Sequence, residues 1–231
     1  MYRAPIIFYD EGAYFSETLD GAVLQHGFRE GKSWSVDASL YGGGWSLLAY
    51  DPSSPEWSIG RVRADNAVGT QLWLNTPIQG VRVGASAQAY KWKGIDDEGT
   101  ISARQDVWEV QGSLDATFDR AFVRAESMLQ NYETDDYFSN YLQVGAAVTP
   151  KLWAVGLAEY AFERNYEVPP YPESFDWHRT AGFGLNYKVT PQFVVKAEHH
   201  WNKGVQVEQS VPDPNDAPRF RYFILSASAS F

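Results

Sequence analysis

The sequence predicts an all-β chain folded as an antiparallel, up-and-down transmembrane β-barrel. Apolar and polar residues alternate with a period of two along most of its 231 residues. Short and long connections alternate between these segments. Mean hydropathy is -0.38, and no run approaches the roughly 18 apolar residues of a spanning helix. Because lipid-facing and lumen-facing residues of a barrel strand cancel in any window, this value excludes helical membrane proteins only.

About eleven strands are expected from this alternation. Residues 33–40, 81–89, 105–118, 121–133, 194–201 and 221–231 each place apolar side chains on one face and polar side chains on the other. Residues 151–164 are ambiguous, because Glu159 and Glu163 share a parity with Trp153, Val155 and Leu157. Their pattern leaves open which face is which.

The connections fall into two sets. Tight turns are expected at residues 29–32, 76–77, 119–120, 149–150 and 190–191, and long polar loops at residues 42–65, 93–100, 131–136, 166–173 and 203–218. Short turns at one end and long loops at the other are typical of outer-membrane barrels. With the short turns on the periplasmic side, the last strand runs toward the periplasm.

Aromatic residues make up 16% of the chain and gather near strand ends. Trp108 and Phe118 share a face, and Trp177 and Tyr187 repeat their spacing. In a strand tilted by about 40° such a pair stands roughly 25 Å apart along the membrane normal, which is the height of an apolar band. Mostly small residues lie between them, which favours a lipid-facing surface over a packed core.

The final strand, Arg221 to Phe231, resembles the C-terminal assembly signal of outer-membrane barrels. The signal residues are Phe223, Leu225, Ala227, Ala229 and Phe231, with Ala229 where a bulkier residue is common. Residues 2–15 and 19–22 are also similar to a segment inside proteobacterial porin-like proteins. This resemblance implies that Met1 is an internal position and that the chain is the C-terminal part of a porin of about sixteen strands, about five of them missing. Residues 1–18 are then a lumen-folded loop or a frayed end, and residues 19–231 the barrel.

The resemblance also implies a function. It is passive diffusion of small hydrophilic solutes or ions through the bacterial outer membrane, with no enzymatic activity and no cofactor. The implied partners are outer-membrane lipid, lipopolysaccharide and the barrel-assembly machinery, with a homotrimer as the assembly to test. Residues 1–10 show no signal-peptide core. The formal charge of -10 disfavours nucleic acid as a partner.

The polar face supplies the expected lumen lining. Its predicted members are Arg82, Gln88, Glu109, Asp115, Arg124, Glu126, Lys188, Lys196, Glu198 and Arg221. Charges of both signs argue against strong selectivity, and the acidic excess predicts a weak preference for cations. A solvated face of a soluble sheet is the alternative interpretation.

Other chemistry has weaker support. Residues 96–98 and the acids Glu133, Asp135 and Asp136 match no calcium-loop spacing and are better explained as solvated loop acids; no metal site is predicted. His199 and His200 are adjacent in a strand and so point to opposite faces, which argues against a catalytic pair.

Three alternative functions remain open on the sequence. They are an outer-membrane lipid-modifying enzyme, an adhesin-like barrel with a closed lumen, and a soluble β-propeller. An open sheet has unpaired edges that invite aggregation, so poor stability is expected for this chain alone.

Overall fold

The computed structural model describes residues 20–30, 33–50, 59–95, 99–165, 173–204 and 219–230. The expected lumen loop or frayed end at residues 1–18 lies outside these ranges, as does Phe231. No helix in the described ranges is long and apolar enough to cross a membrane.

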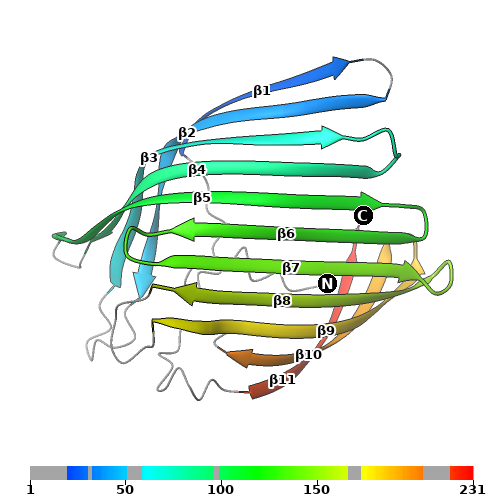
Figure 1. The fold of residues 1–231 in the computed structure, drawn as a ribbon. Helices are drawn as coiled ribbons and strands as arrows, with labels where there is room; N and C mark the ends of the chain where they lie inside the picture. The colour runs from blue at the N-terminus through cyan, green and yellow to red at the C-terminus, as the bar shows by residue number, and fades with distance from the viewer. Residues whose placement is uncertain are drawn as a thin grey trace.

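Eleven antiparallel strands form one sheet in which every strand pairs with its sequence neighbours, in the order β1 to β11. The strands are β1 (Asp20–Glu30), β2 (Trp34–Tyr50), β3 (Ile59–Asn75), β4 (Val81–Ile95), β5 (Ile101–Thr117), β6 (Ala121–Asn131), β7 (Asp136–Ala147), β8 (Leu152–Arg164), β9 (Ser174–Thr190), β10 (Phe193–Gly204) and β11 (Arg219–Ala229). The predicted all-β, up-and-down meander is confirmed. Figure 1 shows the sheet curling from β1 at one edge to β11 at the other. A single continuous sheet is incompatible with the separate four-stranded blades of a propeller.

The long loop expected at residues 42–65 is wrong, because β2 continues to Tyr50 and β3 begins at Ile59. One bulge on β3 shifts the register with both neighbouring strands: Gly43 and Trp45 of β2 pair with Ala67 and Ala64, and Asp65 and Val68 pair with Lys91 and Ala89 of β4. Asn66, within this bulge, has a φ of 54°. A bulge adds a residue and bends the strand, so the alternation of β3 changes parity there although the pairing continues.

Threonine side chains stabilise three of the tight turns. In three Thr-Pro turns the Thr hydroxyl accepts a backbone N–H: Ile78 N to Thr76 at 3.2 Å, Leu152 N to Thr149 at 3.0 Å, and Gln192 N to Thr190 at 3.3 Å. These local bonds stabilise a turn where proline cannot donate. At the other end of the sheet, residues 132–135 also form a tight turn, closed by Tyr132 N to Asp135 O at 2.9 Å. The long loop expected at residues 131–136 is therefore wrong.

The sheet has two chemically different faces. We call the face that carries Gln88, Glu126 and Glu198 the inner face and the opposite one the outer face. On the outer face large apolar side chains remain exposed on most strands, for example Leu24 at 73% and Leu225 at 68%. The inner face holds most of the buried polar side chains, among them Glu159, His178 and His200. A water-soluble sheet would show the reverse distribution.

Candidate functional site

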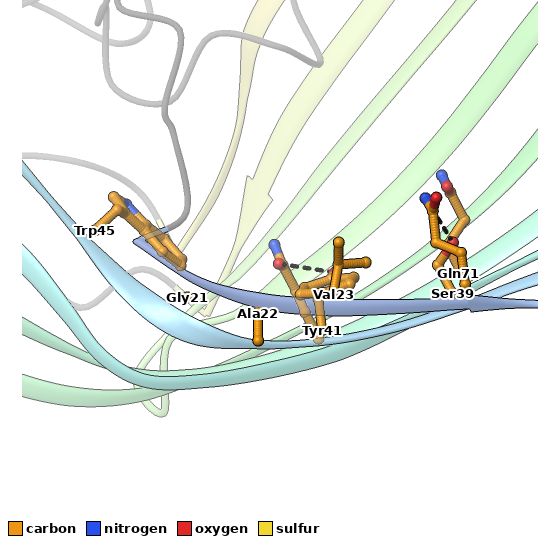
Figure 2. A pocket seen from close by; sticks show the side chains of 9 residues that line it. Gly21, Ala22, Val23, Ser39, Tyr41, Trp45 and Gln71 are labelled. Carbon is orange, nitrogen blue, oxygen red and sulfur yellow. Dashed lines mark hydrogen bonds between the residues drawn. The ribbon is translucent and has the colours of Figure 1, made fainter.

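The candidate site is the inner face, where polar side chains from neighbouring strands meet. Figure 2 shows Ser39, Tyr41, Trp45 and Gln71 projecting to the concave side of the sheet, while Ala22 points the other way. They line a pocket of about 470 Å³, to which Gln25 and Gln88 also contribute. The lining residues carry no formal charge. This part of the wall therefore presents amides, hydroxyls and aromatic rings.

Nine of the ten predicted lumen residues lie on this inner face by register, and one does not. The nine are Arg82, Gln88, Glu109, Asp115, Arg124, Glu126, Lys188, Lys196 and Glu198. Arg221 pairs directly with Trp201 and shares the outer face with Phe223. Its assignment to the lumen is wrong. Odd-numbered positions of β11 carry the apolar, outward side chains, and Arg221 is one of these positions.

Near the short turns the inner face carries cations. Arg82 Nη2 lies 2.9 Å from Asp115 Oδ2, and Arg124 Nε lies 3.7 Å from Asp115 Oδ1. Lys188 and Lys196 lie near the same end, on β9 and β10. The side chains of Arg82 and Arg124 are 47% and 48% exposed. Their ion pairs therefore contribute little stability and leave the charges available to solutes.

Further along the strands, glutamine side chains donate hydrogen bonds to the carboxylates of neighbouring strands. Tyr41 donates to Gln88 Oε1 at 3.3 Å, and Gln88 donates to Glu109 Oε2 at 3.1 Å. In parallel, Ser86 donates to Gln111 at 3.2 Å and Gln111 donates to Glu126 Oε2 at 3.1 Å. Each bridge crosses to another strand, so these groups are held along the wall by side-chain hydrogen bonds as well as by the backbone.

A third group is fully buried and lies on β8, β9 and β10. Glu159 pairs in register with Thr180, and Thr180 with Asn202. Thr180 donates to Asn202 Oδ1 at 2.6 Å, so its oxygen accepts from His178 Nε2. Glu159 Oε2 lies 3.8 Å from that same nitrogen. The arrangement resolves the facing of β8, because Glu159 and Glu163 are buried on the inner face together with Val155 and Leu157.

Sequence reasoning missed His178, Thr180 and Asn202 as members of the site. Their partner Glu159 is on β8, whose facing was ambiguous, and the register that joins the strands is not visible in one sequence. The sequence did contain one signal. All three residues are even-numbered, like Lys188 and Lys196 on the same strands, and so alternation places them on the same face. The shift at Ala161 and Phe162 breaks that parity at the start of β9.

Glu198 and His200 form a second buried pair. His200 Nε2 lies 3.1 Å from Glu198 Oε2, and its ring stacks on Tyr222 with centroids 4.7 Å apart. His199 lies on the other face, its ring edge-on to Trp201 at 4.4 Å. The two histidines therefore do not act together, as their adjacency in a strand predicted.

Four inner-face glycines lie directly opposite aromatic rings. The pairs are Gly69 with Tyr41, Gly84 with Trp73, Gly145 with Phe122, and Gly182 with His200. A Cβ built on Gly84 would lie 2.9 Å from the Trp73 ring, and one on Gly182 would lie 2.9 Å from His200 Nδ1. At Gly69 and Gly145 the added atom would overlap the ring. Each ring therefore lies over the neighbouring strand, in space that only glycine leaves free.

The predicted loop acids do not form a metal site in the described ranges. Asp136 is bound by Arg164 at 2.9 Å and by Asn131 at 2.9 Å. No group of three or more His, Asp or Glu in the described ranges is arranged to hold a metal ion. Residues 96–98 lie outside those ranges.

Comparisons with known proteins add a likeness to solved structures. No protein-family model matches the sequence, and no curated protein matches it. Among solved structures, one similar fold is "OmpT (in-vitro folded), an outer membrane protein of Vibrio cholerae". It is 10% identical, with 90% of this chain and 88% of that chain covered, at a TM-score of 0.47.

Taken together, the inner face is a charged and hydrogen-bonding wall backed by an apolar outer surface. Its Glu and His side chains are held by neighbouring side chains. Such a wall can offer polar contacts to water, ions and hydrophilic solutes along its length.

Proposed function

We propose that the chain forms the wall of an outer-membrane, porin-like channel through which small hydrophilic solutes or ions diffuse passively, and that it catalyses no reaction. The observation that carries this proposal is the exposed apolar outer face, opposite a polar inner face, on one continuous sheet. Soluble monomers rarely expose a contiguous apolar patch above a few hundred Å². Lipid would cover this face, and pairing on both sides of β2 to β10 already satisfies the backbone groups of these strands, which lipid cannot satisfy.

The exposed aromatic side chains support a sheet that spans the membrane. Trp108 is outward and 42% exposed, and Phe118, directly after β5, is 47% exposed. Tyr187 is likewise 47% exposed, whereas the side chain of Trp177 lies outside the described set. Aromatic side chains at both borders of an apolar band are a feature of transmembrane barrels.

The inner face supports a weak preference for cations. Carboxylates outnumber Lys and Arg among its described strand positions, but Arg82, Arg124, Lys188 and Lys196 interrupt them. Rings of one charge sign give strong selectivity, and a mixed wall does not.

The test is single-channel conductance of the chain refolded in detergent and inserted into a planar bilayer. We expect stepwise currents that weakly favour K⁺ over Cl⁻. A chain that is demonstrably folded and inserted but passes no current would overturn the pore. The lipid-modifying enzyme and the adhesin would then become the leading hypotheses.

The partners follow from the same proposal. Outer-membrane lipid and lipopolysaccharide would contact the outer face, and the assembly machinery would read the outward side chains of β11, from Phe223 to Ala229. A homotrimer is the proposed assembly. Cross-linking of the membrane-inserted chain tests it, and a purely monomeric product would contradict it.

A further inference from the structure

Lys and Arg side chains on the outer face gather at one rim of the sheet. In the described strands, outward Lys and Arg occur on β3, β4, β5, β8, β9, β10 and β11, always toward the long-connection ends. At the short-turn ends the outward positions are apolar, as at Leu74, Val83 and Val123. This border also carries Asp65, Asp106, Asp136 and Asp176, each paired with one of the outward cations. Lys and Arg outnumber these acids there, although the formal charge of the chain is -10.

The basic border is densest on β9, β10 and β11. Register places Arg179 opposite Lys203, and Lys203 opposite Arg219, with Arg221 beside them. We call these four residues the rim cluster. Like charges directly opposite one another destabilise a sheet, so this register is unfavourable without a compensating anion.

The protein supplies only part of that compensation. Arg179 forms an ion pair with Asp176, which also accepts a hydrogen bond from Tyr160 at 2.7 Å. Lys203 is attracted to the same Asp176 carboxylate without a close ion pair. Within the described residues, Arg219 and Arg221 have no ion pair. Arg219 and Arg221 are exposed, so a ligand can reach them.

The surroundings of the rim cluster are apolar on the side of the membrane band. Trp201 pairs directly with Arg221 and is 42% exposed, and Phe223, two residues beyond Arg221, is 62% exposed. Tryptophan and arginine side by side are typical of the boundary between hydrocarbon and headgroups. A bound anion must therefore sit at the lipid surface.

We propose that the rim cluster binds the phosphate groups of a lipid headgroup in the leaflet that faces the long connections. This inference rests on the proposed membrane-spanning function and adds a partner to it. Arginine forks match phosphate oxygens. Three neighbouring strands span about 10 Å at roughly 4.8 Å per strand, so the cluster can contact two phosphates of one headgroup.

The experiment uses a single fluorescent reporter, which is straightforward because the chain has no Cys. His199→Cys, labelled with a fluorophore, places the reporter on the outer face beside Trp201. The chain is inserted into phosphatidylcholine vesicles that contain spin-labelled phosphatidic acid or, in parallel, spin-labelled phosphatidylcholine. We expect several-fold stronger quenching by the phosphatidic acid, since each cation near the membrane surface strengthens the attraction to anionic lipid.

The test variant is K203Q/R219Q/R221Q, and the matched control is R82Q/R124Q/K188Q on the inner face. The test variant should lose the preference and the control should keep it. Equal quenching by both lipids, an unchanged preference in the test variant, or an equal loss in the control would overturn the proposal. Loss of the preference on adding inorganic phosphate would mean that the site binds free phosphate instead of lipid.

Circular dichroism and protease protection of the same vesicles separate this proposal from the channel. A chain that does not insert overturns both. A chain that inserts and conducts without any lipid preference overturns the rim cluster alone.

Discussion

At the scale of single residues, the inner-face glycines make the clearest prediction. Phe122 lies over Gly145, where a methyl group would overlap its ring. Gly145→Ala should therefore lower the free energy of unfolding by about 1–3 kcal/mol, the usual cost of overpacking. Denaturant unfolding in detergent micelles measures it.

Gly112→Ala is the matched control for that change. Gly112 is in β5 and has no atom within 4 Å of the Cβ it would gain. It should be neutral or slightly stabilising, because alanine restricts the unfolded chain. An equal loss of unfolding free energy in both variants would mean that any glycine-to-alanine change in a strand has this effect, and that the contact with the Phe122 ring does not cause it.

The buried pair of Glu198 and His200 makes a second prediction at this scale. Glu198→Ala removes the acceptor 3.1 Å from His200 Nε2 and leaves a buried donor without its partner. We expect a loss of about 1–3 kcal/mol in the same unfolding measurement. Glu198→Gln keeps an acceptor oxygen and should recover much of that loss. A glutamine variant as unstable as the alanine variant would mean that charge matters more than the hydrogen bond.

At the scale of strands, the two faces of the sheet should differ in how well they tolerate an added arginine. Leu142 on β7 is outward and 45% exposed, so Leu142→Arg would place a charge in lipid. Near the bilayer centre that costs about 2–4 kcal/mol. Ser113→Arg points inward from β5, opposite Glu126, and should cost less than about 1 kcal/mol. Unfolding in lipid vesicles compares the two, and equal costs would contradict the assignment of faces.

Most strands could be predicted from the sequence because alternation with a period of two needs no knowledge of partners. It failed where the backbone departs from that period. The bulge near Asn66 changes parity on β3, so the sequence predicts a loop where β3 begins. The charge of Arg221 suggests the lumen, but its position among the apolar residues of β11 places it on the outer face.

The buried cluster around Glu159 shows the second limit. Alternation assigns a face to each strand but does not say which residues of neighbouring strands lie opposite each other. The contact of His178, Thr180 and Asn202 depends on the register of β8, β9 and β10, which is set by turn lengths and by the bulge near Phe162. Nothing within a single strand reports that register.

At the scale of the whole molecule, the prediction concerns ion selectivity. Removing two inner-face charges with E109Q/E126Q should lower the permeability ratio of K⁺ to Cl⁻ by about twofold, since the wall charges act through water and salt. The reversal potential in a KCl gradient measures it. The control D106N/D136N removes the same charge from outward positions and should leave the ratio unchanged. A shift of the same size in both variants would assign selectivity to net charge and not to the wall.

The rings that lie over glycines also bear on the width of the water path. A Tyr, Trp or Phe standing upright on a strand would reach far across the bore, whereas a ring laid flat on the next strand adds little more than its own thickness. The calibre of such a channel therefore depends on residues that have no side chain at all. One methyl group at Gly69, Gly84 or Gly145 would lift a ring into the passage and narrow it without any change in loops or strand number.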